Sequence, residues 1–345
     1  MSSSSSKLTR RTFLKLGGAA AGGALIGGVT LPWVRRVDQP RANVMVLKAE
    51  SYEQELADLL LRGISQYPQI VKRARGGRVV LKPNIVDHYA AHPVNTHPLI
   101  VAAVAAAFYR LGAAEVIVAE GPGHRRDSEM LLELSGFDDV LRAAKLPYVD
   151  LNLDAVSPVS LSADYTGLKR MFFPRTILGA DLIVSMPKLK THHWSGVTLS
   201  LKNMFGVVPG VKYGWPKNIL HWRGITQSIV DIYNAVRPGF AIVDGIEGME
   251  GDGPLHGDVT KSGHVVMGEN LTAVDATAAR LMGVYPERID YLVHMMRFGG
   301  TVNAHRIYQI GENTSELAQD FAVMKHMAHI KQPIPRIKQW LLLGL

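Results

Sequence analysis

Short apolar runs alternate with amphipathic segments along most of this chain, and that alternation limits its fold more than any other feature. The apolar runs predict strands at 44–47, 78–81, 115–119, 148–151, 181–185, 240–243 and 264–267. Apolar residues at helical spacing predict helices at 52–64, 96–111, 128–144, 219–236 and 272–282. Such alternation is typical of an α/β fold with a largely parallel sheet flanked by helices.

The domain plan follows from these elements. Residues 43–345 are expected to form one α/β domain, and the loop-rich segment 152–220 is expected to be an insertion or a second small lobe. Asn95 or Thr96 is the expected cap of the helix that begins at 96, and Gly136 is expected to break the helix at 128–144.

Four polar motifs each follow a predicted strand directly: KPN at 82–84, EGPGH at 120–124, PKLKTHH at 187–193 and DGIEGMEGDGP at 244–254. In open α/β sheets, ligands bind in the crevice beyond the carboxyl ends of the strands. The four motifs therefore predict one composite site at this edge of the sheet.

The third motif lies in a segment without acids. No Asp or Glu occurs between Asp181 and Asp231, whereas this interval holds Lys188, Lys190, Lys202, Lys212, Lys217 and Arg223. Lysine and histidine side chains bind phosphate and carboxylate groups. A solvated basic loop is the alternative, but the apolar residues interspersed with these lysines favour at least partial burial.

The candidate site residues come from these motifs. Lys188, Lys190 and His192 are two residues apart, so a continuing strand would place them on one side. We predict His192 and Lys188 as catalytic, with His192 as the acid/base because an unperturbed imidazole titrates near neutrality. The predicted ligand-binding residues are Lys82, Asn84, Lys190, Lys202 and Asn203.

The fourth motif begins a segment, 244–258, with five acids, five glycines and no Lys or Arg. Carboxylates in such a segment can bind a divalent metal, and the predicted metal ligands are Asp244, Glu247, Glu250 and Asp252. The alternative is that these acids neutralise the lysines of the third motif in an ion-pair network. The sequence leaves both open.

The first 42 residues form a separate segment. TRRTFLK at 9–15 matches the twin-arginine export pattern and precedes a Gly/Ala-rich apolar run, which predicts folded export by the twin-arginine (Tat) translocase. The protein would then lie in the periplasm or on the outer face of the cytoplasmic membrane. No clean cleavage site follows, so a membrane anchor stays open. The tail 333–345 is expected to pack on the body, with contact to a membrane surface as the alternative.

Charge and cysteine content exclude some functions. Residues 1–42 carry seven basic residues against one acid, so they account for +6 of the net charge of +8. The body is nearly neutral, which argues against a nucleic-acid partner. The chain has no cysteine, which excludes disulfides, thiolate zinc sites and Cys-ligated iron–sulfur clusters.

Taken in order, these motifs resemble the DUF362 family, a domain of unknown function, over about residues 78–300. Further matching segments are LKNMFGVVPG at 201–210, His221 and AVDATAARLMG at 273–283. The resemblance adds His221 to the predicted ligand-binding residues. Many members carry ferredoxin-type Cys clusters, and since this chain lacks cysteine, that electron-transfer role does not extend to it.

The family supplies no settled reaction, so the function is predicted from the residues. They favour an exported enzyme that acts on a small anionic substrate, with a divalent metal as an optional cofactor. The alternatives are a non-catalytic protein that binds an anion or a metal complex, and an accessory subunit of a membrane redox system.

Overall fold

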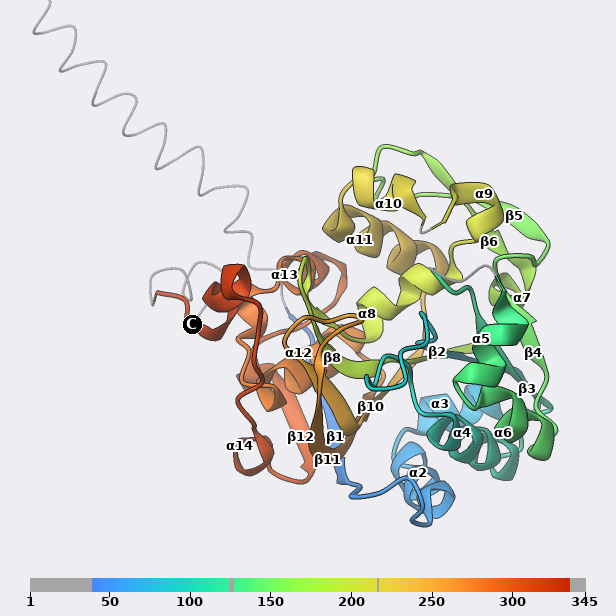
Figure 1. Ribbon diagram of the computed structural model, residues 1–345, viewed down its shortest axis with the longest axis horizontal. Helices are drawn as coiled ribbons and strands as arrows, with labels where there is room; N and C mark the ends of the chain where they lie inside the picture. Colours follow the sequence, from blue (N-terminus) through green and yellow to red (C-terminus); the bar gives the residue numbers. More distant parts are fainter. Residues whose placement is uncertain (1–38, 124–126, 216, 336–345) are drawn as a thin grey trace, which may run out of the picture. The chain divides into compact units, whose positions relative to one another are not determined.

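Strands and helices alternate in the computed structural model, which describes residues 39–123, 127–215 and 217–335 (Figure 1). The strands are β1 (Ala42–Lys48), β2 (Arg78–Pro83), β3 (Glu115–Glu120), β4 (Tyr148–Asp150), β5 (Val156–Ser160), β6 (Arg170–Pro174), β7 (Leu182–Met186), β8 (Lys188–His192), β9 (Gly196–Thr198), β10 (Phe240–Glu250), β11 (Asp258–Gly268) and β12 (Ile307–Gly311). The twin-arginine motif, His124 and the tail from 336 onward lie outside the described residues.

The helices that connect these strands are α2 (Leu56–Ile64), α3 (Pro68–Ala74), α4 (Pro98–Arg110), α5 (Ser128–Leu134), α6 (Phe137–Ala143), α7 (Arg175–Leu178), α8 (Ser200–Asn203), α9 (Gly210–Tyr213), α10 (Asn218–Trp222), α11 (Ile225–Val236), α12 (Leu271–Leu281), α13 (Asp290–Met295) and α14 (Thr314–Leu317). Short 3₁₀ turns are η1 (Met204–Val207), η2 (Pro286–Arg288), η3 (Met296–Phe298), η4 (Ala304–Arg306) and η5 (Lys325–Lys331).

One sheet, in the order β12-β1-β11-β10-β7-β2-β3-β4, forms the centre of the body. The pairs from β10 through β7, β2 and β3 to β4 are all parallel, whereas β11 is antiparallel to both of its neighbours. β8 continues from β7, pairs with β10 and carries β9 at its other side. The predicted α/β class with a largely parallel sheet is confirmed.

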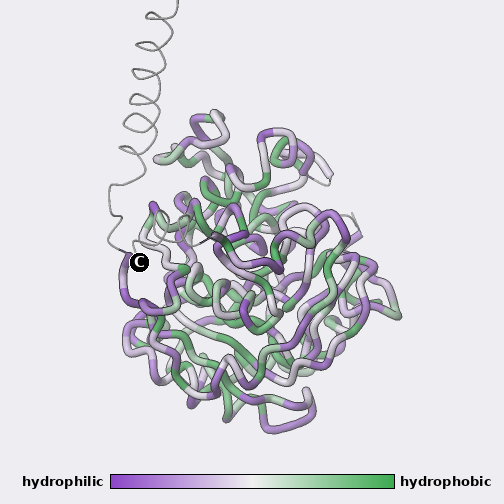
Figure 2. The backbone as a smooth tube through the Cα atoms, turned by 90° about the vertical axis from the view of Figure 1, so that its left-hand side faces the viewer, coloured by the Kyte–Doolittle hydropathy of each residue, from purple (hydrophilic) through white to green (hydrophobic). Residues whose placement is uncertain are grey.

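Helices cover both faces of the sheet, because alternate strand residues point to opposite sides. Met267 packs in a core that includes residues of α2, α4 and α6. The adjacent Gly268 faces the other side, since a Cβ placed there would meet Val274 of α12 at 2.9 Å. The interior strands are hydrophobic, and much of the hydrophilic chain lies at the periphery (Figure 2).

The order of the strands creates a switch point between β2 and β7. The chain passes from β2 to β3 and β4 on one side, then returns to β7 on the other side of β2. A crevice opens at such a point beyond the carboxyl ends of the strands, where ligands bind in α/β proteins. KPN and EGPG stand at the ends of β2 and β3, and PKLKTH follows β7.

Some predicted elements differ from the structure. The helix predicted at 219–236 is wrong as a single element, because Gly224, with φ of 96°, separates α10 from α11. The strand predicted at 240–243 continues to Glu250, because β8 and β11 pair with its second half. The break at Gly136 is confirmed, with φ of 72°.

The predicted cap of α4 is also wrong. His97 caps this helix by accepting from the N–H of Leu99. The hydroxyl of Thr96 instead accepts from the N–H of Asn84 and donates to the carbonyl of Met186. Asn95 accepts from the N–H of Val86. Both residues therefore anchor the loop after β2 rather than the helix.

The segment 152–220 contains β5 and β6, which form a separate two-stranded antiparallel sheet. It belongs to the same compact unit as the rest of residues 39–333.

Candidate functional site

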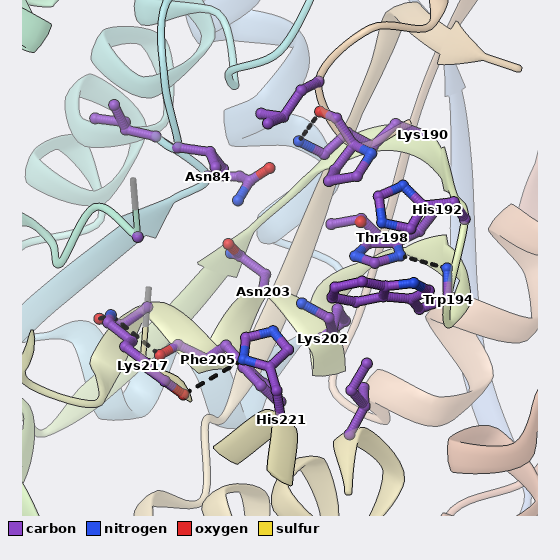
Figure 3. A pocket seen from close by; sticks show the side chains of 18 of the residues that line it. Asn84, Lys190, His192, Trp194, Thr198, Lys202, Asn203, Phe205, Lys217 and His221 are labelled. Atoms are coloured by element: carbon purple, nitrogen blue, oxygen red, sulfur yellow. Dashed lines mark hydrogen bonds between the residues drawn. The ribbon is translucent and has the colours of Figure 1, made fainter. Parts of the chain in front are cut away.

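Residues from all four polar motifs line one cavity of about 680 Å³ beyond the carboxyl ends of the central strands. The motif residues that line it include Lys82, Asn84, Glu120, Gly121, Lys190, His192, His193 and Asp252. The segment after β8 adds Trp194, Thr198, Lys202, Asn203, Phe205, Lys217, His221 and Trp222. Figure 3 shows that the labelled side chains converge on this space from opposite sides.

Lys82 at the end of β2 is neutralised by a carboxylate. Its Nζ lies 2.5 Å from Oε2 of Glu120 at the end of β3, and it also donates to the carbonyl of Pro83 and to Oδ1 of Asn203. Burial lowers the pKa of Lys82, and the charge of Glu120 opposes that shift. Asn203 donates in turn to the carbonyl of Lys82 and to Ser185, so this predicted ligand-binding residue holds the lysine in place.

Gly206 is required where α8 and η1 approach this ion pair. A Cβ at position 206 would lie 1.9 Å from Oε1 of Glu120 and 2.5 Å from Nζ of Lys82. Only a residue without a side chain fits there, so the glycine lets the chain that carries Lys202 pack against the pair.

Lys188, at the start of β8, is also paired with an acid. Its Nζ donates to Oδ2 of Asp244 and to the hydroxyl of Tyr52, each at 2.8 Å. Both members of the ion pair are buried, and Tyr52 donates to the second carboxylate oxygen of Asp244. Asp244 was one of the four predicted metal ligands. The register of β8 against β10 sets Lys188 opposite Asp244, so this part of the ion-pair alternative is realised.

Besides Lys82, three lysines line the cavity: Lys190, Lys202 and Lys217. None of the three forms an ion pair with a carboxylate among the described residues. Nζ of Lys190 donates to the carbonyls of Val94 and Pro254 at 2.8 and 3.3 Å. Burial lowers the pKa of Lys190 well below its usual value, and nearby Lys202 lowers it further.

Lys217 and Lys202 differ in how their amino groups are satisfied. Nζ of Lys217 donates to three carbonyls, those of Gly121, Phe205 and Gly206, and burial lowers its pKa to about 7. Nζ of Lys202 lies 4.3 Å from the centre of the Phe205 ring and has no hydrogen-bond acceptor in the described part of the chain. Burial, with a contribution from Lys82, lowers the pKa of Lys202 to about 8.

His192 lies at the end of β8 with one ring nitrogen fixed. Nδ1 accepts from the N–H groups of Trp194 and Ser195 at 3.0 and 3.3 Å. In a neutral imidazole, the nitrogen that accepts carries no proton, so the proton is on Nε2. Burial lowers the pKa of His192 well below 6.5, with Lys202 the next cause, so the ring is neutral at pH 7 and Nε2 is a donor.

Two buried polar atoms at the cavity have no partner among the described residues. They are Oδ1 of Asn84, a residue 7% exposed, and Oγ1 of Thr198, a residue 4% exposed. Buried polar groups in proteins are nearly always hydrogen-bonded, so unpartnered ones at a cavity mark where a ligand or water would bind.

The four-residue helix α8 presents Lys202 and Asn203, and Asp275 of α12 fixes its first turn. Oδ1 of Asp275 accepts from the N–H and hydroxyl of Ser200, and Oδ2 accepts from the N–H of Leu201. Burial raises the pKa of Asp275 to about 7, and these three hydrogen bonds oppose the shift.

The other three predicted metal ligands lie apart along β10 and the turn after it. Oε2 of Glu250 accepts from the N–H of Ala322, and Glu247 is partly buried near Tyr52. Asp252 lies at the cavity, 3.7 Å from Nδ1 of His193. Within the described ranges no group of three His, Asp or Glu side chains is arranged to hold a metal ion. Metal binding by these acids stays a prediction.

The structure thus brings together all six predicted ligand-binding residues: Lys82, Asn84, Lys190, Lys202, Asn203 and His221 line the cavity. Of the two predicted catalytic residues, His192 lines it, while Lys188 is held by Asp244. The sequence interpretation assigned no role to Glu120, Thr198 or Lys217. The absence of acids around Lys217 was the one signal that could have identified it.

Comparisons with known proteins agree on the family. The model of a family described as a domain of unknown function, DUF362, matches residues 79–280. A thylakoid-associated protein (sll1697) of Synechocystis sp. is 28% identical over 268 residues, covering 74% of this chain and 79% of that protein.

Two solved structures are distantly similar to part of this chain. The lactate racemase apoprotein from Thermoanaerobacterium thermosaccharolyticum matches at 13% identity with a TM-score of 0.38, over 59% of this chain. A Thermotoga maritima protein matches at 12% identity with a TM-score of 0.35, over 67% of this chain. The matches span 50% and 59% of those two chains, and both likenesses are distant.

None of the helices in residues 39–123, 127–215 and 217–335 combines the length and the apolar character needed to cross a membrane.

Proposed function

The chain belongs to the DUF362 family, and we propose that it is an enzyme that binds a small anionic substrate in the cavity beside Lys190, Lys202 and His192. One observation carries the proposal. The amino group of Lys202 lines the cavity with no acceptor among the described residues, next to two further lysines that lack carboxylate partners.

The charges of the cavity favour an anion. Lys82 and Glu120 neutralise each other. The other lysines of the cavity are Lys190, Lys202 and Lys217, and burial makes their protonation cost free energy. Their pKa values fall because burial disfavours the ammonium form, and the charge of Glu120 opposes this fall only in part for Lys190 and Lys217. A bound anion would supply the missing charge and raise these pKa values again.

The donors still available match a carboxylate or phosphate group. Counted over the described residues, Lys202 as an ammonium has three unused N–H groups, Lys190 has one left after its two carbonyls, and His192 has Nε2–H. Lys217 has none left, since its three donors meet three carbonyls. Lys217 would therefore attract the anion through its positive charge without donating a hydrogen bond to it.

A pKa of about 8 for Lys202 supports catalysis over simple capture. A group that exchanges its proton near neutral pH can act as a general acid or base. In this proposal Lys202 transfers the proton, and His192 donates a hydrogen bond from Nε2, rather than acting as the acid/base that the sequence predicted. A protein that binds the anion without turning it over is the alternative.

Calorimetric titration of the purified protein with inorganic phosphate and with acetate tests the binding step. Lys202→Met should weaken binding at least tenfold, because it removes the ammonium group that has no acceptor in the part of the chain that the structure describes. Lys212→Met is the matched control, since Lys212 lies in the same acid-free segment but is exposed and does not line the cavity. Equal binding by the wild type and Lys202→Met would contradict the proposal.

Two further elements of the proposal await experiment. Metal assistance by Glu247, Glu250 and Asp252 is tested by elemental analysis of the folded protein, and a stoichiometric divalent metal would support it. Export rests on the motif at 9–15: a reporter fused after residue 42 should reach the periplasm, and Arg10→Lys with Arg11→Lys should block it.

A further inference from the structure

The cavity is much larger than the anionic group it would hold. At about 680 Å³ it falls within the range of about 300–1,000 Å³ typical of pockets for drug-sized molecules. By the same measure a single water needs only about 10–15 Å³. A phosphate or an acetate bound at Lys202 would leave most of the space to the remainder of its ligand.

The wall beside Lys202 is aromatic. Phe205 lies under the amino group of Lys202, and its ring centre is 5.8 Å from that of His221. His221 in turn lies 5.8 Å from Trp194, with ring planes 70° apart. The aromatic wall therefore joins α10 to the turn between β8 and β9, and Figure 3 shows Trp194 and His221 on either side of Lys202.

Two tryptophans that line the cavity are unusually exposed. Trp194 is 64% exposed and Trp222 is 81% exposed, and both line the cavity. Exposing so much indole surface is unfavourable in water, and aromatic side chains at the edge of a pocket are well suited to hold a planar group. Trp222 follows His221 at the end of α10, and both residues line the cavity.

We propose that the ligand of this cavity carries an aromatic ring next to its anionic group, with the anion at Lys202 and the ring against Trp194 and Trp222. This inference rests on the proposed function and names its substrate class: an aromatic carboxylic acid or an aromatic phosphate ester. The lysines provide affinity for the charge, and the tryptophans select the planar group.

Paired titrations test the inference, with phenyl phosphate compared with inorganic phosphate, and phenylacetate compared with acetate. The aromatic member of at least one pair should bind at least about tenfold more tightly, as expected when one ring stacks on an aromatic side chain. Cyclohexyl phosphate is the control for apolar bulk, and it should bind more weakly than phenyl phosphate. The pair with the larger preference distinguishes a phosphate ester from a carboxylic acid.

Single substitutions show which side chains produce the preference for the aromatic compound. Trp194→Ala and Trp222→Ala should each reduce the aromatic preference while leaving the affinity for inorganic phosphate within about twofold. Tyr308→Ala is the matched control, because Tyr308 is 69% exposed on β12 and does not line the cavity. Phenyl phosphate should also quench tryptophan fluorescence in the wild type, and less in both tryptophan variants.

The two proposals fail in different ways. If neither phenyl phosphate nor phenylacetate binds more tightly than its non-aromatic counterpart, or if both tryptophan variants keep the aromatic preference, the aromatic inference is wrong and the anion site stands. If no anion binds at all, the proposed function fails, and this inference fails with it.

Discussion

Lys217 should make the stability of the ligand-free protein rise with pH above neutrality. The residue is 3% exposed and its pKa is about 7, whereas a lysine in an unfolded chain has a pKa of about 10.4. Between these two values the unfolded state binds more protons than the folded state. The free energy of unfolding therefore increases with pH in this window.

The size of the effect follows from the two pKa values. A single group contributes at most about 1.4 kcal/mol per pH unit, and protonation of Lys217 in the folded state is only half complete at pH 7. Integrated from pH 7 to pH 9, the linkage stabilises the folded state by about 2 kcal/mol. Lys202, with a pKa of about 8, should add about 1 kcal/mol over the same interval.

Urea unfolding at pH 7, 8 and 9, followed by tryptophan fluorescence, measures this dependence. Lys217→Met should lose about 2 kcal/mol of the rise between pH 7 and 9. Its absolute stability should also fall, because the carbonyls of Gly121, Phe205 and Gly206 lose their donor. The slope is therefore the informative quantity. Lys212→Met, which removes an exposed lysine, should keep the wild-type slope.

An identical slope in the wild type and Lys217→Met would refute the reasoning. It would mean that Lys217 stays protonated throughout, with its three carbonyls sufficient to hold the charge. The buried histidines do not confuse the result. Burial lowers the pKa of His97, His192 and His264 below 6.5, so they titrate below this window.

Three substitutions test the packing around the site. Gly206→Ala should destabilise the protein by about 3 kcal/mol, measured by thermal unfolding, because its Cβ would displace the buried pair of Lys82 and Glu120; Gly123→Ala, where a Cβ meets nothing within 4 Å, should cost little. Asp244→Asn should cost about 3 kcal/mol in urea unfolding by leaving Lys188 buried without its carboxylate, and a loss below 1 kcal/mol would argue against the pair. The pKa of the Asp275 carboxyl is about 7, so between about pH 4 and pH 7 the folded state binds more protons than the unfolded state, and the free energy of unfolding falls as the pH rises. Asp275→Asn should remove this fall. Unfolding measured at pH 5 and pH 7 checks this, and an unchanged difference between the two would contradict the assignment.

Local pattern was sufficient to predict most of the fold. The strands at β2, β3 and β7 are continuous apolar runs, as expected for parallel strands buried on both faces, and their ends are marked by Lys82, Glu120 and Met186. Errors arose where local patterns were ambiguous. The acids and glycines after Val243 resemble a loop, but pairing with β8 and β11 keeps that segment extended as the second half of β10.

The position of the candidate site could be predicted from the sequence, but the partners of its lysines could not. Motifs at the ends of neighbouring parallel strands must meet, so the gathering of Lys82, Asn84 and Lys190 follows from the topology. The partner of each lysine depends on strand register and on side chains far along the chain. Lys188 meets Asp244 across β8 and β10, while Lys190, two residues later, donates to the carbonyls of Val94 and Pro254.

The position of α8 could not be predicted from the sequence either. Lys202 reaches the cavity because Asp275, 73 residues later, holds the first turn of the helix, and because Gly206 admits the chain beside Lys82. Neither contact has a local signature. The exposed Trp194 and Trp222 could not be told from ordinary surface or core residues until the cavity between their elements was defined.

Proton uptake on anion binding shows whether a bound anion charges the lysines of the cavity. Calorimetry of phosphate binding at pH 8.0, in buffers with different ionisation enthalpies, counts the protons taken up per anion. With the pKa of Lys202 at about 8, this residue is half deprotonated in the ligand-free protein, and a bound anion should protonate it. We expect the uptake of about half a proton or more per anion, and a smaller uptake in Lys202→Met. Binding without proton uptake would contradict the proposal that the bound anion supplies the counter-charge of these lysines.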